Sequence, residues 1–187
     1  MSRTNVSSAV TNMVIAALLC AIGIIIPLFS PLKIILEPMS FTLASHVPTF
    51  LAMFISPVTA IFVSIGTAIG FFMTSPIVIA FRALSHIVFA LIGSFILKKY
   101  PKYIESFNKT WLFNILMALI HAVCEVLVVV PFYFQNAMGA GYYAKGFMFS
   151  VILLVGVGTI VHSMVDFIIA YVIYKPIKKL MKRMAVA

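Results

Sequence analysis

The sequence has few charged residues. Only 9% of its 187 residues are Asp, Glu, Lys or Arg, whereas 64% are hydrophobic and the mean hydropathy is +1.19. A soluble domain carries charge at roughly a quarter of its positions. A chain this poor in charge could not cover a water-facing surface, which excludes a soluble globular protein. We therefore predict an all-α integral membrane protein whose residues 1–187 form one domain, because the length fits a single helical bundle.

Cysteine is also scarce, and the common catalytic motifs are missing. Cys20 and Cys124 both lie in apolar segments without metal-site spacing, which argues against a disulfide and against a thiolate metal site. The sequence has no His-Glu-x-x-His signature, no Gly-x-Ser-x-Gly elbow and no phosphate-binding glycine loop. We therefore expect no enzymatic activity. Active transport would have to be powered by partner subunits or by an ion gradient.

Long apolar runs are abundant, and about 20 apolar residues are enough to cross a bilayer. Six segments qualify or nearly qualify, the second and third being short: 11–29, 41–55, 58–73, 77–97, 111–134 and 147–174. They predict a six-helix transmembrane bundle with a basic tail at 175–187. Most Lys and Arg then lie on the side of the two termini, where they would meet anionic lipid headgroups. The positive-inside rule therefore places both termini in the cytoplasm.

Three of these segments each carry two ionisable side chains four residues apart. The pairs are Arg82 with His86, His121 with Glu125, and His162 with Asp166. Residues four apart lie on the same face of a helix. A charged side chain at mid-membrane costs on the order of 2.5–3.5 kcal/mol on insertion scales and usually faces the bundle interior. Each pair is therefore predicted to face inward.

Depth along the helices separates these pairs. Counting about 1.5 Å per residue from the outer ends, Arg82 and Glu125 lie at similar depth in the outer half, with His86 and His121 nearer the middle. One interpretation is a buried ion pair with histidines that hydrogen-bond across helices. The other is an outward-opening pocket for a small polar ligand, in which Arg82 binds a carboxylate. Both interpretations can hold together.

The third pair and two further ionisable residues have separate expectations. Asp166 lies deeper than the outer pairs, so His162 and Asp166 are assigned a structural or conformational-coupling role. His46, near the outer end of the second segment, and Glu37, in the first outer loop, are added as candidate substrate-binding residues. No metal site and no cofactor are expected, because Arg82 would repel a cation bound among these side chains.

The first segment has no ionisable residue of its own. Its Ala17-x-x-x-Ala21 motif places two small residues on one face, which lets another helix approach closely. Together with the six helices, the long outer first loop and the polar pocket, this motif makes nearly the whole chain resemble the substrate-binding (S) component of an energy-coupling factor (ECF) vitamin transporter. Ser30-Pro-Leu-Lys-Ile-Ile-Leu-Glu-Pro38, Arg82-Ala-Leu-Ser-His86 and His121-Ala-Val-Cys-Glu125 resemble segments of S components for pantothenate and related vitamins.

The resemblance implies a location, a mechanism and partners. Such a protein lies in the bacterial cell membrane and binds a water-soluble vitamin with high affinity near the outer face. It then topples against a transmembrane coupling subunit, whose own partners are two cytoplasmic ATPases. Ala17 and Ala21 would form the docking surface for that subunit.

Several substrates and two other classes of function remain open. Pantothenate is the leading substrate, because Arg82 suits its carboxylate while His86, His121 and Glu125 could bind its hydroxyl and amide groups. Nicotinate, which also has a carboxylate, is the second choice, and pyridoxine or a hydroxymethylpyrimidine follows. A stand-alone proton-coupled transporter or a membrane scaffold are the alternative classes.

Overall fold

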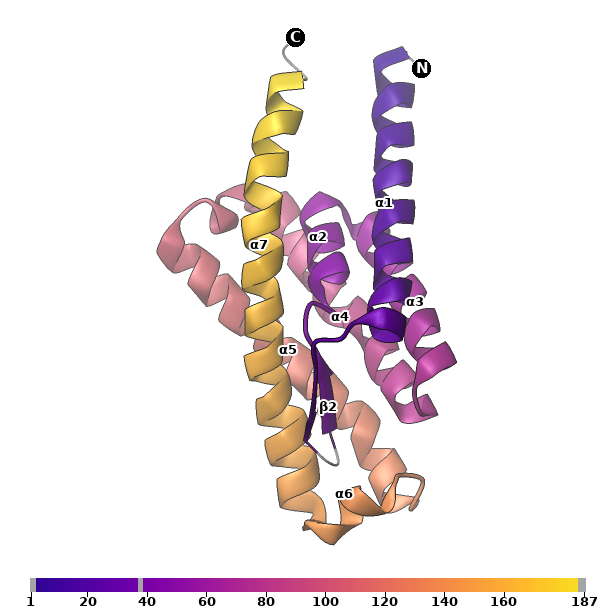
Figure 1. Cartoon of the computed structure of the whole chain (residues 1–187). Helices are drawn as coiled ribbons and strands as arrows, with labels where there is room; N and C mark the ends of the chain where they lie inside the picture. The colour runs from indigo at the N-terminus through magenta and orange to yellow at the C-terminus, as the bar shows by residue number, and fades with distance from the viewer. Residues whose placement is uncertain (1–2, 37–38, 185–187) are drawn as a thin grey trace.

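The computed structural model describes residues 3–36 and 39–184, with side chains for 10–32 and 41–179. Figure 1 shows that both termini lie at one end of the molecule and that α6 lies at the opposite end. The elements in chain order are α1 (Arg3–Phe29), β1 (Lys33–Leu36), β2 (Met39–Thr42), α2 (Val47–Ile55), α3 (Pro57–Thr74), α4 (Ile77–Lys99), η1 (Pro101–Ile104), α5 (Phe107–Phe134), α6 (Ala140–Ala144), η2 (Met148–Val157) and α7 (Gly158–Met184).

Five helical segments in the described part of the chain are long and apolar enough to cross a membrane. They are Val10–Phe29, Pro57–Thr74, Ile77–Lys99, Phe107–Phe134 and Met148–Lys179. Each matches one of the six segments predicted from the sequence, and together they support a multi-pass membrane protein. The basic connection before α5 and the basic end of α7 lie at the same end, joined by an ion pair of 3.1 Å between Lys178 and Glu105.

The second predicted segment differs from the structure. The predicted helix at 41–55 is correct only for its later part, because α2 begins at Val47 and has nine residues, too few to span a bilayer. Its first residues belong to β2, which pairs antiparallel with β1. Ala44 has a φ of 66°, which turns the chain after the strand. Pro48 then favours the start of a helix. The prediction of six spans is therefore not confirmed.

Helix α1 packs closely on α3 through small residues. A Cβ added to Gly66 would lie 2.7 Å from the sulfur of Cys20, and one added to Gly70 would lie 2.7 Å from Cα of Ile24. The two backbones can approach this closely only because neither glycine has a side chain. Ala17 and Ala21 are exposed elsewhere on α1.

A buried aromatic core lies between α2, α4, α5 and α7. The rings of Phe89 and Phe167 both contact Phe50, with centroid distances of 5.2 and 5.3 Å. Phe89 also contacts the imidazole of His121, at 4.6 Å. The core therefore forms an apolar floor beneath the histidines of the site.

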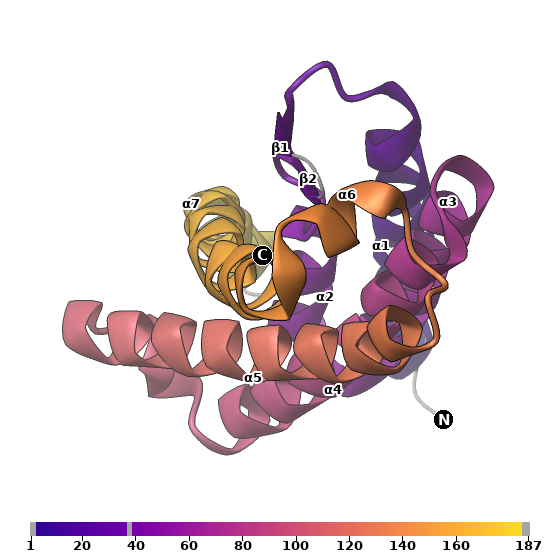
Figure 2. The same cartoon turned by 90° about the horizontal axis from the view of Figure 1, so that it is seen from below.

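The last transmembrane segment begins with an unusual winding. Met148–Val157 is a π-helix that continues directly into α7. A π-helix has i→i+5 hydrogen bonds and more residues per turn, so it rises less per residue than an α-helix. Seen along the bundle in Figure 2, this segment lies beside the β1–β2 hairpin, and α6 crosses the same end. Phe41 of the hairpin approaches α7 at Gly158.

Candidate functional site

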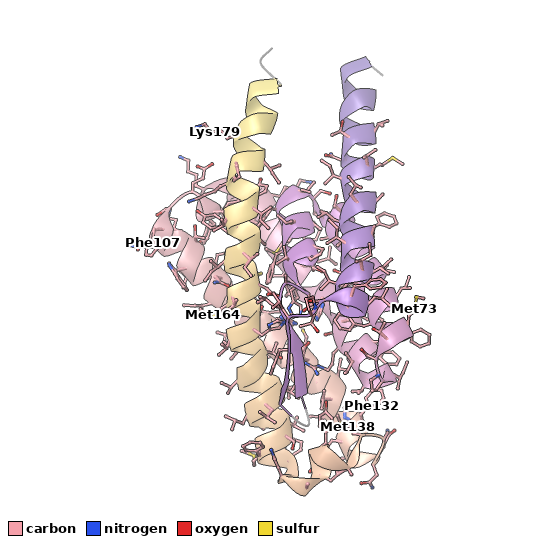
Figure 3. The ribbon with its side chains drawn as sticks, viewed as in Figure 1. Met73, Phe107, Phe132, Met138, Met164 and Lys179 are labelled. Carbon is pink, nitrogen blue, oxygen red and sulfur yellow. The ribbon has the colours of Figure 1, made fainter. Side chains whose placement is uncertain are left out.

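Polar side chains from four elements meet in the middle of the bundle, and nitrogen and oxygen atoms gather there between α7, α1 and the hairpin (Figure 3). The three sequence pairs all contribute, and so does the turn before α2. The members are His46, Arg82, His86, His121, Glu125, Thr159, His162, Ser163 and Asp166. All but His162, which is nearly buried, are buried. The structure thus brings all three pairs into one cluster.

Glu125 on α5 is the centre of the first half of this cluster. Its Oε2 accepts hydrogen bonds from Nη2 of Arg82 at 2.6 Å and from the hydroxyl of Thr159 at 2.5 Å. Its Oε1 lies 3.4 Å from Nε2 of both His86 and His121. The ion pair between Arg82 and Glu125 holds α4 against α5, because separating the two buried groups would leave each charge unpaired at a high cost in free energy. The hydrogen bond from Thr159 connects α7 to the same carboxylate.

Asp166 on α7 is the centre of the second half. One carboxylate oxygen accepts the backbone N–H of Ala44 at 2.9 Å. The other accepts the backbone N–H of His46 at 2.9 Å and lies 3.0 Å from its Nδ1. It also lies 3.6 Å from Nε2 of His162. Asp166 therefore fixes the turn between the hairpin and α2 against α7.

His46 joins the two halves. Its ring centroid lies 4.7 Å from the centroids of His86, His121 and His162. The depth count along straight α-helices had separated Asp166 from the outer pairs, whereas in the structure His46 contacts both groups. Nδ1 of His121 lies 3.1 Å from the hydroxyl of Ser163, which adds a second contact between α5 and α7.

A cavity opens over this cluster. His46, Arg82, His86, Glu125 and His162 line it, together with apolar and hydroxyl side chains of α1, α3 and the hairpin. The cavity has a volume of only about 40 Å³, so admitting a ring-sized ligand requires side chains or the hairpin to move.

Tyr142 of α6 lies close to the same cluster. It is buried, and burial raises the pKa of its phenol, while the nearby Arg82 guanidinium opposes part of that rise. The phenol is therefore neutral at physiological pH and can act as a hydrogen-bond donor. Tyr142 thus places α6, which lies outside the membrane spans, next to Arg82.

The structure places the other predicted residues as follows. Ala17 and Ala21 lie on α1 and do not line the cavity. Glu37 lies outside the described residues. Sequence reasoning missed Thr159 and Ser163, although both share a polar stripe with His162 and Asp166. Their spacing of three, four and seven residues marks one helix face and could have revealed them.

Two groups of these side chains have the composition of metal sites. His46, His86, His121 and Glu125 each offer one donor atom, and these atoms lie within 4.8 Å of one another. The same holds for His46, His162 and Asp166. Imidazole and carboxylate donors suit divalent transition metals. The cluster could therefore bind either an organic anion through Arg82 or a metal ion through its imidazoles.

Comparisons with known proteins identify a relative. No model of a protein family matches the chain, and no solved structure matches it. The niacin transporter NiaX of Lactococcus lactis subsp. cremoris (strain MG1363) is 43% identical over 162 residues, which cover 86% of this chain and 72% of the relative. Because this identity extends over most of both proteins, the chain belongs to the family of the niacin transporter NiaX.

Proposed function

We propose that this protein binds nicotinate in the cavity beside Arg82 and Glu125 and acts as the S component of an ECF vitamin transporter. The relative is named as a niacin transporter. Its substrate supports the nicotinate alternative better than pantothenate, the leading substrate in the sequence analysis. The observation that carries the proposal is the buried Arg82 guanidinium, which lines the cavity and offers the planar fork that a carboxylate needs.

Arg82 and Glu125 act together in this mechanism. Before the ligand binds, Glu125 satisfies the guanidinium through a hydrogen bond of 2.6 Å. Guanidinium has five N–H donors and can contact two carboxylates at once. The nicotinate carboxylate therefore shares Arg82 with Glu125 and does not need to displace it completely.

The cavity also suits an aromatic ring. Phe41 of the hairpin and Phe71 of α3 line it, and both present apolar surface. The pyridine nitrogen of nicotinate is a hydrogen-bond acceptor, for which hydroxyl groups and imidazole N–H groups in the cavity are donors. Small-molecule sites typically combine such apolar walls with polar groups that fix the orientation of the ligand.

Energy for uptake comes from partners in this proposal. The sequence has no phosphate-binding loop, so a transmembrane coupling subunit and two cytoplasmic ATPases would drive transport. The two termini, the basic connection before α5 and the basic end of α7 lie at one end, which we assign to the cytoplasm. The alternative is a proton-coupled transporter that uses His162 and Asp166. Asp166 already accepts two backbone N–H groups, which favours a structural role for it.

Binding of labelled nicotinate and nicotinamide to the purified protein tests the proposal. The two rings are the same, but nicotinamide lacks the carboxylate. Hydrogen bonds to charged groups contribute about 1.5–3 kcal/mol, so nicotinamide should bind roughly 10- to 150-fold more weakly. Arg82→Lys keeps the charge without the planar fork and should weaken nicotinate binding alone. Equal affinities for the two compounds would overturn the role of Arg82.

Transport assays separate the two classes of transporter. Proteoliposomes that contain this chain alone should bind nicotinate without accumulating it. Uptake should require the coupling subunit, the ATPases and ATP. Accumulation driven by a pH gradient in the absence of those partners would support the proton-coupled alternative.

A further inference from the structure

The spacing around Glu125 differs from that of a simple hydrogen-bond network. Oε1 lies 3.4 Å from Nε2 of His86 and 3.4 Å from Nε2 of His121. Hydrogen bonds of this type are usually about 2.7–3.2 Å long. Ligand atoms about 2.0–2.1 Å from a tetrahedral Zn²⁺ ion lie roughly 3.4 Å from each other. The two distances therefore match neighbouring ligands of one metal ion better than hydrogen bonds.

Most of these donor groups are also held by a partner on their other side. His46 contacts Asp166 through Nδ1 at 3.0 Å, which leaves Nε2 as its remaining nitrogen. His121 contacts the Ser163 hydroxyl through Nδ1 at 3.1 Å. Metal-binding histidines almost always have such a carboxylate or other oxygen partner on the second nitrogen. Nε2 of His121 is buried and has no hydrogen-bond partner among the described residues.

We propose that His46, His86, His121 and Glu125 bind one divalent transition-metal ion of the Zn²⁺ type. The sequence argument against a metal was repulsion by Arg82. In the structure Arg82 and Thr159 contact Oε2 of Glu125, whereas Oε1 faces the imidazoles. Arg82 therefore orients the carboxylate through the oxygen that the metal does not use.

Charge balance supports the same site. Arg82 contributes one positive charge, whereas Glu125 and Asp166 contribute two negative charges, so the cluster carries one net negative charge when its imidazoles are neutral. A bound nicotinate anion would raise this to two negative charges in a buried site, which is unfavourable. A divalent cation offsets both. This step rests on the proposed nicotinate function, but the ligand geometry does not.

Metal analysis of the purified full-length protein tests the site. After loading with Zn²⁺ and removal of excess metal, mass spectrometry of the elements should find about one ion per chain. Co²⁺, used as a spectroscopic probe, should give the intense visible absorption of a tetrahedral site. Absence of stoichiometric Zn²⁺, together with a Co²⁺ spectrum identical to that of the free aqueous ion, would overturn the proposal. This test does not depend on the folding of any variant.

Variants then locate the ion. His86→Gln and His121→Gln each remove one ligand at nearly constant volume and should lower metal content at least tenfold. Cys20→Ala and Cys124→Ala are the controls, because the two free thiols are potential zinc ligands outside the proposed site, so their removal should have no effect. Metal retained by both histidine variants, or lost with the thiols, would place the ion elsewhere and overturn the proposal.

The two proposals can fail separately. Chelator-treated protein should bind nicotinate at least tenfold more weakly, and Zn²⁺ should restore the affinity. Tight nicotinate binding that is insensitive to chelation, by a protein that takes up no metal, would overturn the metal site and leave the proposed function standing. Stoichiometric metal without nicotinate binding would support the site and overturn the proposed function.

Discussion

Asp166 on α7 accepts a hydrogen bond from the backbone N–H of His46 at 2.9 Å and contacts its Nδ1 at 3.0 Å. This single carboxylate therefore positions both the backbone and the side chain of a residue 120 positions earlier in the chain. It holds the turn between the hairpin and α2 against the last helix. Through His46, the position of α7 is coupled to His86 and His121 at the cavity.

Asp166→Asn tests this coupling. The amide keeps one oxygen acceptor but replaces the other with a donor that faces the N–H groups of the turn. Leaving such buried groups unsatisfied costs about 1–3 kcal/mol each. We expect weaker nicotinate binding and a lower thermal unfolding temperature, with unfolding measured by the fluorescence of Trp111. Glu105→Gln is the control, because the ion pair of Glu105 with Lys178 is half exposed and contributes about 1 kcal/mol or less. Equal effects of the two substitutions would contradict the coupling.

Thr159→Val should weaken ligand binding without unfolding the protein. Valine has nearly the shape of threonine but cannot donate the 2.5 Å hydrogen bond to Oε2 of Glu125. Glu125 would then be held mainly by Arg82, and both groups would lose their orientation towards the ligand. We expect a roughly tenfold loss of nicotinate affinity in equilibrium binding, in line with one hydrogen bond to a charged group. Thr159→Ser restores the hydroxyl and should restore most of the affinity; failure of this rescue would indicate a packing effect.

The transmembrane helices and the polar stripes were predictable from the sequence, whereas the hairpin was not. Long apolar runs bounded by Ser-Pro pairs predict α3 and α4 to within a few residues. The run 41–55 is also mostly apolar, but its first part forms β2 and a turn with a positive φ at Ala44. Ala44 has no side-chain signal for that conformation, which is stabilised by a distant acceptor on Asp166.

The contact of His46 with Asp166 could not be predicted for a related reason. Depth was counted with the rise of an α-helix, about 1.5 Å per residue. Met148–Val157 is a π-helix with a smaller rise, so residues after it lie less deep than that count indicates. The composition of the segment, which is rich in Val and Leu, does not distinguish the two windings.

Substitution of Gly158 tests whether the hairpin controls access to the cavity. A Cβ at Gly158 would lie 2.6 Å from Cζ of Phe41, which would have to move away from α7. Since Phe41 lines the cavity, we expect Gly158→Ala to accelerate ligand dissociation, measured by stopped-flow displacement, and thereby to lower the affinity for nicotinate. Gly156→Ala is the matched control, because its nearest contact is Val126 at an ordinary 3.5 Å. Indistinguishable kinetics for the two variants would exclude a role for this contact.

Bulky residues on α1 should separate ligand binding from transport. Ala17 and Ala21 are exposed and do not line the cavity. The contacts of α1 with Gly66 and Gly70 of α3 use other residues of α1. If the surface around Ala17 and Ala21 docks on the coupling subunit, Ala17→Trp and Ala21→Trp should abolish ATP-driven uptake and co-purification of that subunit. Nicotinate binding by the isolated protein should stay within about twofold. Leu127→Trp, at an exposed position of α5, is the control and should assemble normally. Loss of binding in step with loss of assembly would show instead that α1 supports the fold of the site.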